Sequence, residues 1–470
     1  MTDQGCDIGM VGLGVMGQNL ALNIADHDFS AVGFDRDSEK TKELVSRATG
    51  GSRVFGVSSL QELTGRLKRP RAIIVLVPAG PPVDAVIEGL LPYLEPADLV
   101  IDSGNSHFRD TDRRLKSLAE KGLLFVGMGV SGGEEGARYG PSMMPGGPKE
   151  GYERVKPVLE KAAAQVHGEP CVTYLGGGSA GHYVKMVHNG IEYGLMQLLA
   201  ETYDIMKHGL GLSNDALHEV YSRWARTELN AYLIEITAKI FLKSDDKTGM
   251  PLIDLIRDQA GQKGTGKWTS LDALDLQVPI PTLDIAVAMR DLSGYESERN
   301  AASKALKGPD SRYQGDKARF LSQLENALYA AMIITYSQGL ALLRRASNAY
   351  GYNLDLEAVA RIWRGGCIIR AALLEDIRSA FSTNPELPNL LLDPHLGQAV
   401  QVRQADLRSV LQVAAGLGLP VPGLMASLGY FDAYRRGRLP TNLIQAQRDY
   451  FGAHTYQRID EEGTFHTQWE

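Results

Sequence analysis

The chain has 470 residues, of which 44% are hydrophobic and 22% charged, an ordinary composition for a folded protein of two or three domains. Its net charge of -7 gives no reason to expect nucleic acid or an anionic membrane as a partner, so a bound phosphate would have to be held by locally placed cations. The three cysteines lie far apart without metal-ligand spacing, which indicates a reducing compartment and no metal site. The polar N-terminus and the absence of a run of about 18 apolar residues predict a cytoplasmic protein without a membrane span.

Residues 1–178 alternate between short β-rich runs and amphipathic helical segments. These strands are apolar on both faces and alternate with helices such as Met16–Asp26, which predicts a doubly wound, mostly parallel sheet in a Rossmann-like α/β domain. Several strands end in loops rich in Gly, Asn or Ser, at the sheet edge where such folds bind ligands. The strands are predicted at Ile8–Val11, Ala31–Phe34, Ala72–Val77, Leu99–Asp102 and Leu124–Gly127, and the last is followed by a loop at 129–133.

A glycine-rich turn follows the first strand and opens a helix, and the acidic Asp35 ends the next strand. In this context the pattern is a dinucleotide-binding fingerprint. Gly12 makes the tight turn, Gly14 lets a pyrophosphate approach the backbone, and Gly17 lets helix and strand pack closely. The residues of the turn are Gly12, Leu13, Gly14, Val15, Met16 and Gly17.

The end of the second strand leaves the choice of dinucleotide open. Asp35 could accept hydrogen bonds from ribose hydroxyls, which favours NAD, whereas the neighbouring Arg36 suits the 2′-phosphate of NADP.

From residue 179 to 434 helical periodicity dominates and predicts a large all-α domain. Ser179 is a candidate N-cap for the first helix, and Gly209 a candidate terminator. Residues 435–470 form an aromatic-rich tail, which we expect to dock on its own subunit or on a neighbour. Further helices are predicted at 227–242, 316–346 and 356–362, and glycine-rich loops at 261–269 and 363–367.

The first of these helices carries an unusual polar face. Lys185, His188, Asn189, Glu192 and Tyr193 follow the spacing i, i+3, i+4, i+7 and i+8, which places them on one side of the helix. Such a face either meets solvent or lines a polar pocket, and the face alone does not decide between the two. The apolar stripe lies elsewhere on the helix, and two glycines indicate close approach of backbone or ligand. The stripe is Val184, Val187, Ile191, Leu195 and Leu198, and the glycines are Gly190 and Gly194.

Six motifs in order resemble those of the decarboxylating 6-phosphogluconate dehydrogenases of the long, dimeric type. They are Gly12–Leu20, Gly129–Gly147, Gly181–Tyr193, Gly261–Thr269, Trp363–Arg370 and Leu443–Thr455. The resemblance implies oxidation of 6-phosphogluconate to ribulose 5-phosphate and CO2, with NADP as cofactor and without a metal. It also implies a homodimer in which the tail of one subunit reaches the active site of the other.

The resemblance implies roles for individual residues. Lys185 matches the catalytic lysine and Glu192 the catalytic glutamate. The matches for binding the substrate carboxylate and hydroxyls are Asn105, Ser131, Gly132, Gly133, His188 and Asn189. The matches for binding the phosphate are Tyr193, Lys263, Thr265 and Arg290, with Arg448 and His454 from the second subunit. The cofactor would be held by the glycine-rich turn, Asp35, Arg36, Asp37, Val77, Pro78, Ala79 and Asn105.

Two departures from the family pattern concern the cofactor. The triplet that usually reads Asn-Arg-Thr is here Asp35-Arg36-Asp37, and Pro78 stands where a lysine is usual. The preference for NADP over NAD therefore stays open, while the expected reaction does not change.

In that reaction Lys185 would remove the proton of the 3-hydroxyl, so its pKa must fall well below its usual value of about 10.4. Glu192 would protonate C1 after loss of CO2. Two alternatives are a β-hydroxyacid dehydrogenase for an unphosphorylated acid, and a cofactor-binding protein without activity. The cations Lys263, Arg290 and Arg448 disfavour the first, and the presence of both catalytic side chains disfavours the second.

Overall fold

The first part of the chain forms a seven-stranded sheet in the order β3-β2-β1-β4-β5-β6-β7. The structure is a computed structural model that describes residues 5–48, 53–309 and 311–470. All neighbouring strands are parallel except β6 and β7. The strands are β1 (Ile8–Val11), β2 (Ala31–Phe34), β3 (Val54–Gly56), β4 (Ala72–Val75), β5 (Leu99–Asp102), β6 (Leu124–Ser131) and β7 (Ser142–Gly146).

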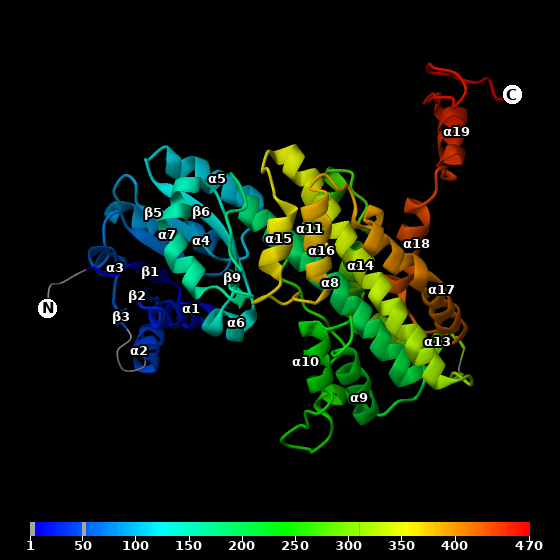
Figure 1. The fold of residues 1–470 in the computed structure, drawn as a ribbon, viewed down its shortest axis with the longest axis horizontal. Helices are drawn as coiled ribbons and strands as arrows, with labels where there is room; N and C mark the ends of the chain where they lie inside the picture. The colour runs from blue at the N-terminus through cyan, green and yellow to red at the C-terminus, as the bar shows by residue number, and fades with distance from the viewer. Residues whose placement is uncertain (1–4, 49–52, 310) are drawn as a thin grey trace.

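Helices cover both faces of this sheet (Figure 1). One apolar cluster joins Met10, Ile74 and Ile101 to α1 and α7, and the other joins Val11 and Val75 to α3, α4 and α5. Successive residues of each strand thus enter opposite cores, which is why the strands are apolar throughout. The doubly wound fold is confirmed. The helices are α1 (Val15–Asp26), α2 (Ser38–Arg47), α3 (Leu60–Gly65), α4 (Pro81–Leu90), the 3₁₀ turn η1 (Leu91–Tyr93), α5 (Phe108–Ala119), α6 (Gly133–Tyr139) and α7 (Lys149–Ala162).

Some predicted bounds in this part were wrong. The strand β6 continues from Gly127 to Ser131, because the antiparallel edge strand β7, which was not predicted, pairs with this extension. Much of the segment 129–133 is therefore strand and not loop. Conversely, β4 ends at Val75, so Val77 already belongs to the following loop. The helix α1 begins at Val15, one residue before its expected start.

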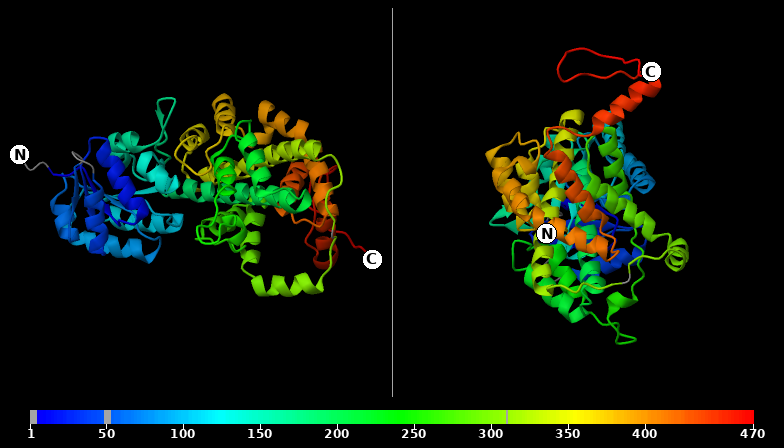
Figure 2. Two further views of the ribbon diagram at one scale, coloured as in Figure 1. Left: turned by 90° about the horizontal axis from the view of Figure 1, so that it is seen from below. Right: turned by 90° about the vertical axis from the view of Figure 1, so that its right-hand side faces the viewer.

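The second part of the chain is helical and is built around α8 (Ala180–Asp204) and α14 (Lys317–Tyr350), which pack against each other. Figure 2 shows α8 running from the sheet into the helical part. By length and composition α14 could cross a membrane, but 89% of its most apolar window is buried in the fold, as in the core helix of a globular protein.

A short hairpin, β8 (Gln165–Val166) and β9 (Glu169–Pro170), links the two parts. The remaining helical elements are η2, a π-helix (Ile205–Gly209), α9 (Asn214–Trp224), α10 (Tyr232–Ile240), η3 (Leu252–Leu255), α11 (Thr265–Asp275), α12 (Pro281–Ser293), α13 (Glu296–Ala305), α15 (Leu356–Trp363), α16 (Leu373–Thr383), η4 (Leu390–Leu392), α17 (Pro394–Gly416), α18 (Pro422–Tyr434) and α19 (Thr441–Gly452).

Three features of the helical part differ from the prediction. The helix expected from residue 227 begins at Tyr232, because the preceding Ala231 pairs with Ala371 in an isolated β-bridge. Residues 265–269, expected in a loop, form the first turns of α11. Ser179 occupies the N-cap position of α8, but its hydroxyl donates to Asp112 at 2.9 Å and does not cap the helix.

Among the residues that the structure describes, the C-terminal tail does not pack on the body of its own chain. Figure 2 shows α19 and the segment after it projecting from the molecule. This segment is tied to α19 through Asp449, which accepts hydrogen bonds from the backbone of Thr455 and Thr467 and from the Trp469 indole. The side chain of Phe451 on α19 is 72% exposed. Docking on its own subunit was therefore wrong, and docking on a neighbour stays a prediction.

Candidate active site

The polar face of α8 is buried. Lys185 is 6% exposed and His188 is fully buried, Asn189 and Tyr193 are buried, and Glu192 is partly exposed. The opposite, apolar stripe is also buried, and its Ile191 lies against Gly339 of α14. Because both faces are enclosed, the polar side chains form a buried polar group and not a solvated surface.

Glycines let α8 cross β6 and β7 at backbone contact distance. A Cβ atom on Gly181 would lie 2.2 Å from the carbonyl oxygen of Met144. A Cβ atom on Gly129 would lie 2.3 Å from the Cβ atom of Lys185. Gly190 and Gly194 similarly admit the side chains of threonines on other helices. The close approach expected from the sequence is thus an approach of protein side chains.

His188 lies at the centre of this buried polar group. Its Nε2 atom is 3.4 Å from the Ser131 hydroxyl at the end of β6, and its Nδ1 atom is 3.1 Å from Oδ1 of Asn189. The same Nδ1 atom is 3.5 Å from Nζ of Lys185 and 3.9 Å from Oε2 of Glu192. The structure therefore brings together five of the side chains that the sequence proposed for the site.

Burial shifts the three ionisable groups toward their neutral forms. Desolvation lowers the pKa of Lys185, although the carboxylate of Glu192 opposes this shift. Desolvation raises the pKa of Glu192, against the opposing effect of Lys185 and Arg290. Desolvation and the nearby Lys185 hold the pKa of His188 well below its usual range. A neutral amine and a protonated carboxyl can act as base and acid on one substrate.

A second group of side chains lies further along α8. Asn189 donates to Oγ1 of Thr265 at 3.2 Å, which ties α8 to the start of α11. The guanidinium of Arg290 lies 3.6 Å from the centre of the Tyr193 ring and donates to the carbonyl of Gly261. Lys263 is exposed on the adjoining loop. Within residues 5–48, 53–309 and 311–470, neither Lys263 nor Arg290 is paired with a carboxylate, so both cations are available to an anion.

The glycine-rich turn has the geometry that a dinucleotide requires. A Cβ atom on Gly17 would lie 1.9 Å from the carbonyl oxygen of Gly12, which explains the tight packing of the turn. Gly14 has nothing within 4 Å of its Cβ position, and the first turn of α1 carries no acidic side chain. This open backbone at a helix N-terminus fits a pyrophosphate. Gly80 in the loop after β4 is similarly open and has a φ of 87°.

Asp35 has a structural partner. Its Oδ2 atom accepts a hydrogen bond of 2.7 Å from the backbone N–H of Leu13, and its Oδ1 atom accepts one of 2.9 Å from the N–H of Asp37. Its neighbour Arg36 is exposed at a groove of about 870 Å³ beside β2 and β3. Lys42 also lines this groove. The carboxylate is therefore occupied by the chain itself, while a guanidinium faces solvent at the end of β2.

The remaining predicted residues are spread over three places. Asn105 is exposed in the loop after β5, and Gly132 and Gly133 join β6 to α6 with φ angles of 122° and 62°. Arg448 and His454 lie on the projecting tail, where Arg448 donates to Gln445. The structure of one chain thus does not bring the two tail residues to the polar face of α8. In the described part of the chain no group of three His, Cys, Asp or Glu side chains could hold a metal ion.

The sequence analysis predicted a glycine-rich loop at Trp363–Cys367 but did not assign a role to it. Trp363 packs edge-on against His188, with ring centres 5.5 Å apart. The backbone N–H of Ile368 lies 3.4 Å from the Ser131 hydroxyl. A Cβ atom on Gly132 would lie 2.5 Å from the carbonyl oxygen of Gly366. The loop therefore encloses the polar side chains of α8 beside His188 and Ser131.

Family models match both parts of this chain. The model for the NAD binding domain of 6-phosphogluconate dehydrogenase matches residues 7–176, and the model for the 6-phosphogluconate dehydrogenase C-terminal domain matches residues 181–469. The chain belongs to the 6-phosphogluconate dehydrogenase family.

Individual members of the 6-phosphogluconate dehydrogenase family are similar over nearly their full length. The decarboxylating enzyme of Synechococcus elongatus is 54% identical, with 98% of each chain covered. The NADP(+)-dependent, decarboxylating enzyme of Bacillus subtilis is 53% identical, also with 98% of each chain covered. The 6-phosphogluconate dehydrogenase of Plasmodium falciparum, whose structures are described in apo form and with NADP+ or 6-phosphogluconate, superposes with a TM-score of 0.95 at 48% identity. That comparison covers 99% of this chain and 100% of the other.

Proposed function

We propose that this protein oxidatively decarboxylates 6-phospho-D-gluconate to D-ribulose 5-phosphate and CO2, with NADP as the oxidant, in the pentose phosphate pathway. The observation that carries the proposal is the placement of buried Lys185 and partly exposed Glu192 beside His188, where their pKa values are shifted in opposite directions. A chain that only bound a dinucleotide would not need a buried amine and carboxyl on one helix face.

Lys185 and Glu192 divide the proton transfers. Neutral Lys185 takes the proton of the substrate's 3-hydroxyl, while the bound oxidised nicotinamide supplies the hydride acceptor. The resulting ammonium polarises the 3-keto oxygen as CO2 leaves, because a positive charge stabilises the developing enolate. Protonated Glu192 then donates its proton to the former C2 of the substrate, which becomes C1 of the product. The Nδ1 atom of His188 lies 3.5 Å from Nζ of Lys185 and 3.9 Å from Oε2 of Glu192, so the two groups are close enough to act on neighbouring carbons of one substrate.

The substrate is proposed to lie along the polar face of α8. His188 and Asn189, together with Ser131, Gly132, Gly133 and Asn105, bind its hydroxyls and carboxylate. The phosphate would be held by Tyr193, Lys263, Thr265 and Arg290. Arg290 supports this assignment, because no carboxylate of the described residues pairs with it and an unphosphorylated acid would leave it without a counter-charge.

The cofactor is proposed to lie on the glycine-rich turn, Gly12–Gly17, and across the loop that contains Val77, Pro78 and Ala79. At the end of β2, exposed Arg36 would hold the 2′-phosphate, with Asp35 and Asp37 shaping the turn. The hydrogen bond from Leu13 N–H to Asp35 supports this assignment, because a carboxylate already used by the chain is less available to the ribose.

The tail is proposed to complete the active site of a second copy of the chain. Segments 1–178, 179–434 and 435–470 would then serve as dinucleotide-binding domain, substrate and dimerisation domain, and exchanged tail. The exposed apolar side chains of α19 and the distance of Arg448 and His454 from their own pocket support this arrangement. We expect the homodimer to work in the cytoplasm.

The reaction is tested by supplying 6-phosphogluconate or gluconate with NADP and following the reduced nicotinamide and released CO2. Turnover of 6-phosphogluconate alone is expected. Equal turnover of gluconate would contradict the phosphate assignment, and no turnover of either would contradict the proposed function.

The exchanged tail is tested by complementation between two inactive variants, Lys185→Met and Arg448→Ala. In a mixed dimer one site has an intact Lys185 and receives an intact tail from its neighbour. Co-expression should therefore restore about a quarter of the wild-type activity if subunits pair at random. No restoration, with dimers present, would show that the tail acts on its own chain.

A further inference from the structure

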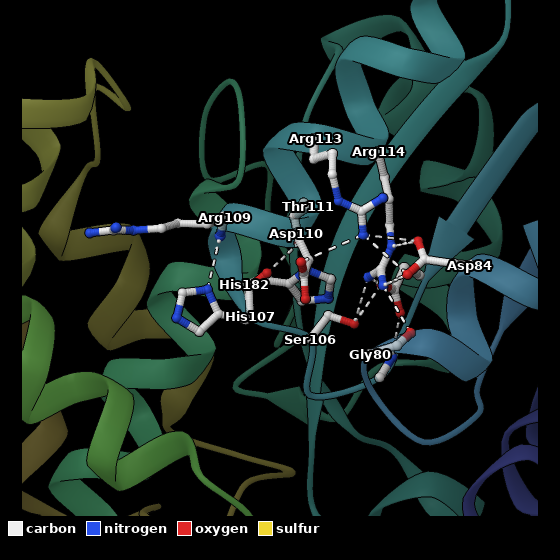
Figure 3. Close-up of polar contacts among 12 residues, drawn as sticks. Gly80, Asp84, Ser106, His107, Arg109, Asp110, Thr111, Arg113, Arg114 and His182 are labelled. Atoms are coloured by element: carbon white, nitrogen blue, oxygen red, sulfur yellow. Dashed lines mark hydrogen bonds and ion pairs between the residues drawn. The ribbon is translucent and has the colours of Figure 1, made fainter.

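A buried arginine joins two loops at the carboxyl edge of the sheet. Arg114 projects from α5 and is 2% exposed. Figure 3 shows its guanidinium between Asp84, Ser106 and the backbone of Gly80, while Arg113 reaches Asp84 from another side. The loop after β4 carries Gly80, and the loop after β5 carries Ser106.

Each donor of this guanidinium has an acceptor. The Nε and Nη2 atoms donate to the two carboxylate oxygens of Asp84 at 2.8 and 3.1 Å, and Nη2 also donates to the carbonyl of Gly80 at 3.0 Å. The Nη1 atom donates to Asp102 at 3.2 Å and to the Ser106 hydroxyl at 3.3 Å. These five contacts match the five N–H groups of an arginine, and lysine has only three donors at one point.

The carboxylate of Asp102 in turn shapes the loop after β5. This side chain is fully buried at the last position of the strand. Its Oδ1 atom accepts from the backbone N–H of Gly104 at 3.1 Å, and its Oδ2 atom accepts from the Ser106 hydroxyl at 2.6 Å. The loop so fixed presents Asn105 to solvent at the edge of the sheet.

The two loops also touch each other directly. A Cβ atom on Gly104 would lie 3.1 Å from the carbonyl oxygen of Val77, so there is little room for either backbone to move toward the other. In parallel sheets of this kind, ligands bind at the carboxyl ends of the strands. Small displacements of these loops therefore act directly on the ligand-binding edge.

We propose that Arg114 is a positioning residue, which fixes the loops at 77–80 and 103–106 relative to each other and thereby places the cofactor-binding backbone and Asn105. The inference rests on the proposed function, because that function assigns ligands to these loops. If Arg114 only held α5 against α4, its hydrogen-bonded ion pair with Asp84 would be sufficient. The further contacts with Gly80, Asp102 and Ser106 reach both loops.

The test compares Arg114→Met and Arg114→Lys with the control Arg113→Met. Arg113 also pairs with Asp84, at 3.1 Å, but it is exposed and contacts neither loop. Three quantities are measured: the Kd of NADP by calorimetry without substrate, kcat and KM for both ligands, and the thermal midpoint. Arg114→Met should weaken NADP binding and lower kcat by about tenfold or more each, because misplacement by about 1 Å has large effects. The Kd of NADP and the kcat of Arg114→Lys should lie between those of Arg114→Met and the wild type, and Arg113→Met should match the wild type in both.

A purely structural role would have a different signature. If both Arg114 variants lowered the thermal midpoint but kept wild-type Kd and kcat, the inference would be overturned, as it would if Arg113→Met were equally impaired. If Arg114→Met fails to fold, Ser106→Ala is the second variant. It keeps the ion pair between Arg114 and Asp84 and loosens only the loop after β5. It is expected to lower kcat and to weaken NADP binding less than Arg114→Met does, and an unchanged kcat would also overturn the inference. A wild-type protein inactive on 6-phosphogluconate would count against the proposed function, while the NADP-binding measurement would still test Arg114.

Discussion

Replacing Gly129 by alanine should displace the base without touching its chemistry. The new Cβ atom would lie 2.3 Å from Cβ and 2.7 Å from Cγ of Lys185. These two atoms are next to the backbone and cannot move aside as the end of a flexible side chain can. Ordinary carbon contacts are about 3.5 Å or longer, so helix and strand must separate locally by about 1 Å. A misplacement of this size costs about a hundredfold in rate, which corresponds to about 2.7 kcal/mol of activation free energy.

The assay is initial-rate formation of the reduced nicotinamide with saturating ligands, well below the thermal midpoint of each variant. Gly136→Ala is the matched control, because its Cβ position is 3.6 Å from the nearest atoms outside its own turn and meets no obstruction. We expect kcat to fall about a hundredfold for Gly129→Ala and to stay near wild type for Gly136→Ala. A wild-type kcat for Gly129→Ala would refute the proposed dependence of turnover on the position of Lys185.

Three further predictions concern the ionisable groups. Lys185→Met should keep the Kd of 6-phosphogluconate within about tenfold and abolish turnover, because the base acts mainly in the transition state; near-normal turnover would remove Lys185 from the mechanism. Burial lowers the pKa of Lys185 and raises the pKa of Glu192. The value of kcat/KM should therefore fall when the pH drops below the pKa of Lys185, and it should also fall when the pH rises above the pKa of Glu192. Glu192→Gln should slow turnover and abolish the alkaline limb of the pH profile, and an unchanged profile would contradict the role of Glu192 as acid. Asp35→Asn, which can still accept from Leu13 through its amide oxygen, should raise kcat/KM for NADP relative to NAD, whereas Arg36→Ala should lower it about tenfold or more; comparing both cofactors for each variant checks the assignment.

The glycine-rich turn and the strands were accessible from sequence because their signals are local. A tight turn before a helix needs Gly12, and a strand buried on both faces reads as a continuous apolar run, so fold class and family followed from short segments. The strands β3 and β7 and the extension of β6 were not found. The strand β7 and the extension of β6 are stabilised by pairing with each other, and neither has a strong pattern of its own.

The sequence determined which side chains share a face of α8, because helical periodicity places Lys185, His188 and Glu192 on one side whatever surrounds them. It could not determine whether water or protein lay opposite that face. Only the tertiary structure did so, by packing β6 against Lys185 through Gly129 and thereby removing the solvent that would keep the amine charged. The same holds for Asp35, whose hydrogen bond with Leu13 joins two segments that only the folded sheet brings together.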